Sequence, residues 1–363
     1  MIVLAVLLAS YANQYAKAWD HDLTLEAALY PYVPDIGRFQ DKVYEVWERE
    51  HPDVKLHFAD WDCYASDPDP MVDVFVFDGI YLSSFAAEGH LLPIPSEKIL
   101  EREDLFPYAL QGCFWEGELY ALPQLLCADL LYTRKNDAPL SGVSDIVPLY
   151  NILGDRKTED VIPGENEGLL INLSDALLTK TMMYLDALMD EWQAYTDYSE
   201  LPETTNLSDQ ALEQISALWK MGGEKQVSYW PEDNDAYIRA RRFAEGKGRA
   251  YIGYAEAMDA MGNEAENVVI RPFSYGSEKN IPLFYTDMVG INSMITEDKK
   301  ELAFELANIL ISEEALTGVS RPAKGSDSPQ YLLTVRRSVY EALGQDYPIY
   351  SRLKEIVDKG NRA

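Results

Sequence analysis

The chain has 363 residues, of which 47% are hydrophobic, and it carries a formal net charge of −30 with an isoelectric point near 4.4. This length and apolar content predict a globular protein with room for two lobes, each with its own core. The acidity argues against nucleic acid and anionic membranes as partners, because both attract clusters of lysine and arginine. A negative field does attract a cationic small molecule, although most of the 61 acidic residues are expected to be solvated surface.

The first 20 residues resemble a secretory signal. Met1–Ser10 is a short apolar run, and small residues follow at Ala12, Ala16 and Ala18. The run lacks the basic residues that usually precede it in a signal, so a buried strand is the alternative. We expect a secreted or periplasmic protein, and no membrane insertion, because neither this run nor a later one is long enough to span a bilayer.

Strands and helices alternate over the first quarter of the chain. Apolar residues recur at helical spacing in some segments and alternate with polar residues in others. The predicted elements are a strand over Leu23–Tyr30, a helix from Ile36 to His51, strands over Val54–Phe58 and Met71–Phe77, and a helix over Ile80–Glu88. This order predicts an α/β lobe with its ligand site at the carboxyl ends of the strands.

Strands and helices continue along the rest of the chain. The expected elements are helices over Asn172–Gln193, Ser208–Met221 and Lys299–Ser312, a strand over Asn267–Phe273, and polar loops around Asn151–Glu167 and Asp197–Thr205. Two α/β lobes joined by more than one crossover predict a hinged cleft like that of periplasmic solute-binding proteins. We expect residues 21–128 and 271–315 to form lobe 1, and residues 129–270 and 316–363 to form lobe 2.

Cys127 is a candidate nucleophile in the apolar run Ala121–Ala128. A cysteine in such a run is usually an inert core residue, and Cys113 has an equal claim from its local sequence, although it lies before a turn and away from the predicted cleft strand. Three cysteines, with Cys63 the third, leave open whether two of them pair. All four histidines lie in the first quarter of the chain, so we expect a carboxylate as the base if Cys127 is reactive.

Glu256 is the candidate base, because it lies among aromatic, small and apolar residues in Tyr251–Met258. Burial would raise the pKa of its carboxyl and let it act as a base near neutrality, whereas a solvated helix residue is the ordinary alternative. Neither the histidines nor the cysteines have zinc-site spacing, and the glycine-rich stretches match no phosphate-binding or dinucleotide motif. We therefore expect no metal and no cofactor.

Tyrosines and carboxylates recur together along the chain. The three clearest cases are Tyr30-Pro-Tyr32, Tyr254-Ala-Glu256 and Tyr285-Thr-Asp287, and Tyr64 and Asp78 also follow predicted strands. Any single tyrosine is more often a packing residue. Together, aromatic faces interleaved with carboxylates suit a flat cationic heterocycle.

These pieces, taken in order, resemble the thiaminase I (thiamine pyridinylase) family. The matching segments are Leu29–Asp35, Val74–Gly79, Pro123–Cys127, Tyr254–Glu256 and Tyr285–Asp287. The resemblance implies a two-lobed fold of the type II solute-binding proteins. It also implies that Cys127 is the nucleophile, that Glu256 is its base, and that Asp78 and Asp287 bind the pyrimidine of thiamine. The tyrosines that it places along the cleft are Tyr30, Tyr32, Tyr64, Tyr237, Tyr254 and Tyr285.

The implied activity is a transfer reaction in which the Cys127 thiolate adds to the pyrimidine, the thiazole leaves, and an amine, a pyridine or a thiol takes its place. A non-catalytic protein that binds thiamine or a related pyrimidine is the alternative, but it would have no use for Cys127 or Glu256. A cysteine hydrolase would need a histidine later in the chain. The absence of heptads and of long apolar edges favours a monomer.

Overall fold

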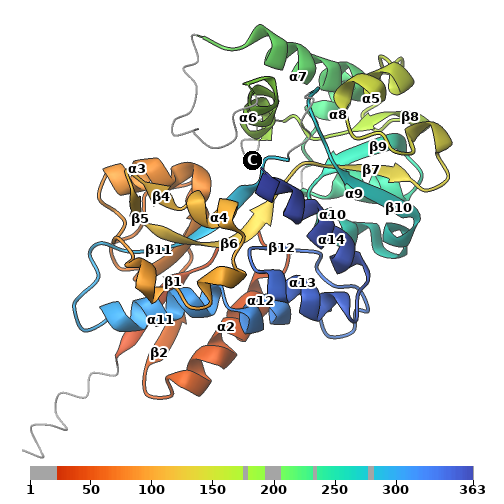
Figure 1. Cartoon of the computed structure of the whole chain (residues 1–363). Coiled ribbons are helices and arrows are strands. Elements are labelled where there is room, and N and C mark those ends of the chain that lie inside the picture. Colours follow the sequence, from red (N-terminus) through yellow and green to blue (C-terminus); the bar gives the residue numbers. More distant parts are fainter. Residues whose placement is uncertain (1–22, 175–178, 193–205, 232–234, 277–281, 363) are drawn as a thin grey trace, which may run out of the picture.

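The computed structural model describes residues 23–174, 179–192, 206–231, 235–276 and 282–362. Within these residues the chain forms two α/β lobes, each built around one sheet (Figure 1). The apolar segment interpreted as a secretory signal and the loop expected at 197–205 lie outside the described residues. None of the described helices has the length and apolarity needed to cross a bilayer.

The first lobe contains a six-stranded mixed sheet in the order β12-β6-β11-β3-β1-β2. Its strands are β1 (Thr24–Ala28), β2 (Lys55–Phe58), β3 (Val74–Asp78), β6 (Ala121–Cys127), β11 (Tyr285–Ile291) and β12 (Leu333–Thr334). Strand β1 runs parallel to β2 and β3, whereas β11 is antiparallel to β3 and β6. All of β3 is buried, as expected for a strand covered on both faces.

Helices pack on both faces of this sheet. They are α2 (Ile36–Glu50), α3 (Leu82–Ala87), α4 (Pro107–Gln111), α11 (Lys300–Leu310), α12 (Glu313–Ser320), α13 (Arg337–Gly344) and α14 (Ile349–Val357), with a small hairpin of β4 (Phe114–Trp115) and β5 (Glu118–Leu119). The predicted helix over 36–51 is confirmed. Asp35 caps it by accepting a hydrogen bond from the Arg38 amide, and Phe39, Val43 and Trp47 on its inner face are buried.

The second lobe contains a four-stranded sheet in the order β10-β7-β9-β8. Its elements are β7 (Leu130–Arg134), β8 (Glu165–Leu170), β9 (Gly248–Gly253), β10 (Val268–Pro272), α5 (Ile146–Leu153), α6 (Thr179–Trp192), α7 (Asp209–Gly222), α8 (Glu224–Val227), α9 (Ile238–Ala244) and α10 (Ala257–Met261). Helix α7 starts as predicted, since the Ser208 hydroxyl accepts a hydrogen bond from the Ala211 amide. The loop expected around 151–167 ends inside β8.

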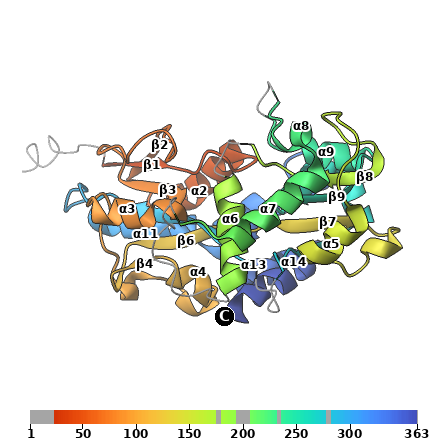
Figure 2. The ribbon, with the colours of Figure 1, turned by 90° about the horizontal axis from the view of Figure 1, so that it is seen from above.

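The chain passes directly from one sheet to the other after β6, where only Ala128 and Asp129 separate that strand from β7. Viewed from above, the two sheets lie side by side with this connection between them (Figure 2). The sequence placed residues 316–363 in lobe 2, but β12 within that segment pairs with β6 of the six-stranded sheet. Helix α13 packs against β12, and α14 packs against α13.

Candidate active site

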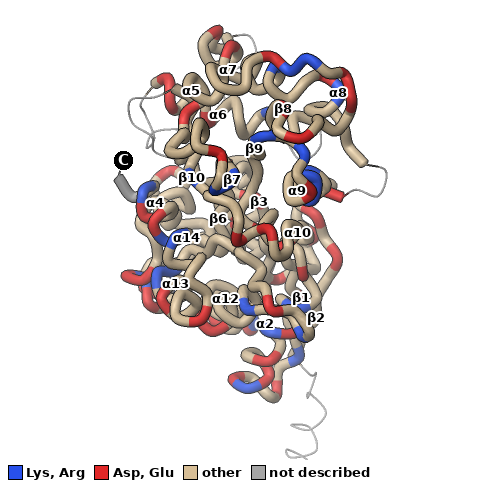
Figure 3. The backbone as a smooth tube through the Cα atoms, turned by 90° about the vertical axis from the view of Figure 1, so that its right-hand side faces the viewer, with Lys and Arg blue, Asp and Glu red and all other residues tan. Residues whose placement is uncertain are grey.

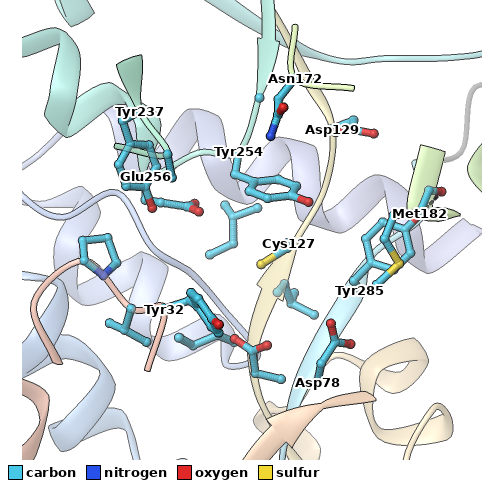
Figure 4. Close-up of a pocket in the computed structure, with 18 of the residues that line it drawn as sticks. Tyr32, Asp78, Cys127, Asp129, Asn172, Met182, Tyr237, Tyr254, Glu256 and Tyr285 are labelled. Carbon is cyan, nitrogen blue, oxygen red and sulfur yellow. Dashed lines mark hydrogen bonds between the residues drawn. The ribbon is translucent and has the colours of Figure 1, made fainter. Parts of the chain in front are cut away.

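A cavity of about 190 Å³ lies between the two sheets (Figure 4). Its lining includes the end of β6, the end of β3, the start of β11, the end of β9 and part of α6. All ten residues named from the sequence line it: Tyr30, Tyr32, Tyr64, Asp78, Cys127, Tyr237, Tyr254, Glu256, Tyr285 and Asp287. Side chains from distant parts of the sequence therefore converge on one cavity.

Two carboxylates face each other on the floor of the cavity. Asp78 at the end of β3 pairs in register with Asp287 on β11, and both are buried. Asp78 accepts hydrogen bonds from the Tyr64 hydroxyl at 2.5 Å and from the Ile80 amide at 3.0 Å. Burial raises the pKa of both carboxyls, and the charges of Asp78 and Glu256 raise that of Asp287 further. Two such neighbours do not ionise together readily, so this pair holds a proton easily.

Three tyrosines form one wall of the cavity above this pair. The Tyr30 and Tyr64 hydroxyls are 2.9 Å apart, and the Tyr32 hydroxyl donates to Asp62 at 2.8 Å. The Tyr32 ring lies with its centroid 5.4 Å from that of Tyr30 and 5.6 Å from that of Tyr64. These tyrosines present aromatic rings to the cavity, and the hydroxyls of Tyr30 and Tyr64 form a hydrogen-bonded chain that ends at Asp78.

Cys127 is the last residue of β6, where it pairs in register with Tyr285 of β11. It is partly exposed and lines the cavity, and all three cysteines are free thiols. Burial, followed by the charges of Asp287 and Glu256, raises the pKa of the Cys127 thiol well above its ordinary value. Cys113, the other candidate, is fully buried and its thiol donates to the Ala109 carbonyl oxygen, so it belongs to the core of lobe 1.

Glu256 follows β9 and lies at the start of α10. Burial raises the pKa of its carboxyl to about 7, opposed by the hydrogen bond that it accepts from Tyr237. The buried Tyr132 fixes the loop that carries Glu256, because its hydroxyl donates to the Tyr254 carbonyl oxygen at 2.7 Å. A carboxylate with this pKa is half ionised near neutrality and can take a proton.

Tyr285 links the two lobes across the cavity. Its hydroxyl donates to the carbonyl oxygen of Met182, on helix α6 of the second lobe. Tyr254 stands close to Cys127 in the close-up (Figure 4). Both tyrosines lie on the side of the cavity away from Tyr32.

Sequence reasoning missed several lining residues: Asp129, Asn172, Met182, Trp230, Arg239 and Tyr251. Asp129 had a usable signal, because it follows Cys127 by two residues at the end of the predicted cleft strand. Arg239 had none, since a helical arginine is normally solvated. Here it is buried and donates to the side chain and the carbonyl oxygen of Gln226.

The fold and the site define a class of protein. The molecule has the two-lobed solute-binding architecture, and its cleft carries a thiol with a carboxylate of raised pKa rather than hydrogen-bonding groups alone. A thiol and a base in one cavity are the parts of a nucleophilic enzyme.

The chain belongs to the thiaminase-1 family. It is 47% identical to a thiaminase-1 of Paenibacillus thiaminolyticus, over 99% of this chain and 88% of that protein. The family model described as the Thiaminase-1 domain matches residues 128–276.

Solved structures agree with this assignment. A structure of thiaminase I from Bacillus thiaminolyticus superposes with a TM-score of 0.90 at 47% identity, covering 93% of both chains. Clostridium botulinum thiaminase I in complex with thiamin superposes with a TM-score of 0.89 at 46% identity, covering 93% of this chain and 92% of that one. A maltose-bound protein of T. maritima, 17% identical with a TM-score of 0.63, covering 92% of this chain and 87% of that one, shares the fold alone. The expected solute-binding-protein fold is therefore confirmed.

Proposed function

We propose that this chain cleaves thiamine through a covalent bond between Cys127 and the pyrimidine ring. Family membership makes the chain a thiamine-cleaving transferase, which exchanges the thiazole for another nucleophile. The observation that carries the residue assignment is the convergence of Cys127, Glu256, Asp78 and Asp287 on one cavity. The following steps use these four groups.

The first step is formation of the thiolate. The pKa of the Cys127 thiol is raised, so the reaction starts from a thiol and not from a thiolate. Glu256, with a pKa of about 7, accepts the sulfur-bound proton as the sulfur begins to bond to the substrate. Thiamine is a cation, and its entry among these carboxylates lowers the energy of the thiolate because it offsets their charges.

The second step is addition to the pyrimidine. The sulfur bonds to C6 of the ring, and the electron pair of the broken ring double bond moves to a ring nitrogen. Asp78 and Asp287 stabilise that nitrogen in its protonated form, because one of the pair holds a proton and the other accepts hydrogen bonds. The tyrosine wall beside Asp78 stacks against the flat ring.

The third step exchanges the groups on the methylene carbon that joins the two rings of thiamine. The carbon–nitrogen bond to the thiazolium breaks, and the thiazole leaves as a neutral ring with that electron pair. An amine, a pyridine or a thiol then bonds to the methylene carbon and displaces an electron pair back into the ring, and an amine or a thiol releases its proton to solvent. Expulsion of the Cys127 thiolate restores the aromatic pyrimidine, and Glu256 returns its proton to the sulfur.

Two further properties belong to this proposal. We expect the protein to act outside the cytoplasm, on the basis of the apolar segment at its start. We also expect it to act as a monomer, since the sequence has neither heptads nor long apolar edges. Gel filtration and localisation of the expressed full chain test the two points.

Turnover of thiamine by the wild type and by Cys127→Ser, with and without added aniline, tests the proposed function. We expect the wild type to release thiazole and form the pyrimidine–aniline product, and Cys127→Ser to lose turnover by a factor on the order of 10³ or more, because a hydroxyl is a far weaker nucleophile. Mass spectrometry detects both products. Tight thiamine binding by both proteins without any product would instead favour the alternative, a binding protein built on the same cleft.

A further inference from the structure

Asp129 is an acidic residue of the cavity lining whose charge the proposed reaction does not use. It lies in the two-residue connection between β6 and β7, and only 5% of its surface is exposed. Its carboxylate lines the same cavity as Cys127. In the close-up, Asp129 lies above the level of the Cys127 sulfur and Asp78 lies below it (Figure 4).

The carboxylate of Asp129 has little within the protein to stabilise a negative charge. Its hydrogen-bond partner is the Tyr275 hydroxyl, at 3.5 Å, which is the outer limit for such a bond. Among the described residues, no lysine or arginine lowers its pKa, and burial raises that pKa to about 7. A buried carboxylate without a counter-charge costs several kcal/mol unless it is protonated or a cation binds beside it.

The groups around Asp129 make its surroundings more negative. The carboxylates of Asp186 and Asp190 lie close enough that the charges of Asp190 and Asp129 raise the pKa of Asp186. One Asp186 oxygen is buried without a hydrogen-bond partner among the described residues. The aromatic rings of Tyr254 and Tyr285 face the same space, and the charge of Asp129 raises the pKa of both hydroxyls.

We propose that Asp129 binds the positively charged ring of the substrate, and so selects ligands that carry a cation on the thiazole side. This inference rests on the proposed function, which places the pyrimidine over Cys127 and against Asp78. The second ring is joined to the pyrimidine through one methylene carbon, so it lies next to Cys127 on the side that Asp78 does not occupy. Asp129, two residues along the chain, borders that side, and Tyr254 and Tyr285 supply the aromatic faces that a cation prefers.

Binding to a pair of ligands that differ in charge tests the role. Thiamine carries the charged ring, whereas 3-deazathiamine is the same shape with a neutral ring, and Cys127→Ser prevents turnover. We expect Asp129→Asn in this background to weaken thiamine binding by ~10-fold or more, the range of an interaction with a charged group, and to change binding of the neutral ligand by less than about 3-fold. Isothermal titration calorimetry measures both dissociation constants.

The matched control is Asp78→Asn in the same background. Asp78 is assigned to the pyrimidine, which both ligands share, so its loss should weaken both by the same factor. Asp129→Ser is a second variant that removes the carboxylate, and it should shift the ligand preference in the same direction as Asp129→Asn.

Two results would overturn the inference. Equal weakening of both ligands by the Asp129 variants would make the residue structural, and unchanged thiamine binding would make its charge irrelevant. Turnover by the wild type separates this inference from the proposed function: cleavage of thiamine with an unaltered ligand preference in the variants refutes the role of Asp129 alone. An absence of both cleavage and thiamine binding refutes the two together.

Discussion

Glu256 is the residue on which the proposed chemistry depends most directly, because no histidine among the described residues lines the cavity. The burial that raises its pKa to about 7 makes it protonated, and inactive as a base, in acid. We expect kcat/KM for thiamine to rise as the pH is raised through about 7. Glu256→Gln should lower kcat by about 10²–10⁴-fold, the usual contribution of a general base.

A pH profile of kcat/KM measures both effects. Asp129 also has a pKa of about 7, so the profile of Glu256→Gln distinguishes the two carboxyls. If the residual activity of Glu256→Gln is flat across this range, Glu256 sets the acid limb. If kcat/KM of Glu256→Gln still rises with pH through the same range, another group causes the rise and the assignment of Glu256 as the base is wrong.

At the scale of single residues, the sequence predicts site residues where a reactive or charged side chain lies among apolar neighbours. Cys127 and Glu256 stood out because each lies among apolar neighbours, and the family resemblance brought in the tyrosines and aspartates. It missed Asn172 and Arg239, because an amide and a helical arginine look like surface residues until the fold turns them inward. The roles assigned to these side chains stay predictions until they are measured.

Strand β11 is the element that places two site residues, since Tyr285 begins it and Asp287 lies in it. Gly290, further along the strand, leaves no room for a side chain. A Cβ atom there would lie 2.5 Å from Leu91 and 3.0 Å from Phe77. Gly290→Ala should therefore displace the strand, lower the free energy of unfolding by about 1–3 kcal/mol, and reduce activity through the shifted site.

Gly37 provides the matched control in urea unfolding. It lies in the first turn of α2, where a Cβ atom would meet nothing within 4 Å. Gly37→Ala should leave the free energy of unfolding unchanged or raise it by up to about 1 kcal/mol, because alanine favours the helix. Equal destabilisation by both substitutions would mean that the close packing around Gly290 is not the cause.

The elements of the fold were predictable where local pattern decides them. The strand over 23–30, the helices over 36–51 and 299–312 and the strand over 267–273 all form close to their expected bounds. The pairing of β12 with β6 was not, because a two-residue strand has no periodicity and its position depends on contacts far along the chain. The helix expected from Asn172 begins, among the described residues, only at Thr179.

At the scale of the whole molecule, the net charge of −30 is spread over both lobes, as the acidic residues in Figure 3 show. A negative field of this size draws a cation toward the molecule and is weakened by salt. We expect kcat/KM for thiamine to fall by several-fold as the ionic strength rises from about 0.01 M, where the screening length is about 30 Å, to about 1 M, where it is about 3 Å. Steady-state kinetics in sodium chloride measure the change.

The uncharged co-substrate serves as the control in the same series. The KM for pyridine, which is neutral above its own pKa, should change little with salt because the field does not act on it. A parallel loss for both substrates would indicate that salt perturbs the fold or the lobes rather than the encounter with thiamine.

The short connection from β6 to β7 has a consequence for the reactivity of the Cys127 sulfur. Cys127 ends a strand of one sheet, and Glu256 follows a strand of the other, so any rotation of one lobe against the other changes the distance between sulfur and base. Before substrate binds the sulfur stays protonated, because burial raises the pKa of the thiol, and a thiol reacts slowly with oxidants and with alkylating agents. In the proposed reaction the thiolate forms only once thiamine has bound, so the reactivity of the sulfur depends on occupancy of the cleft.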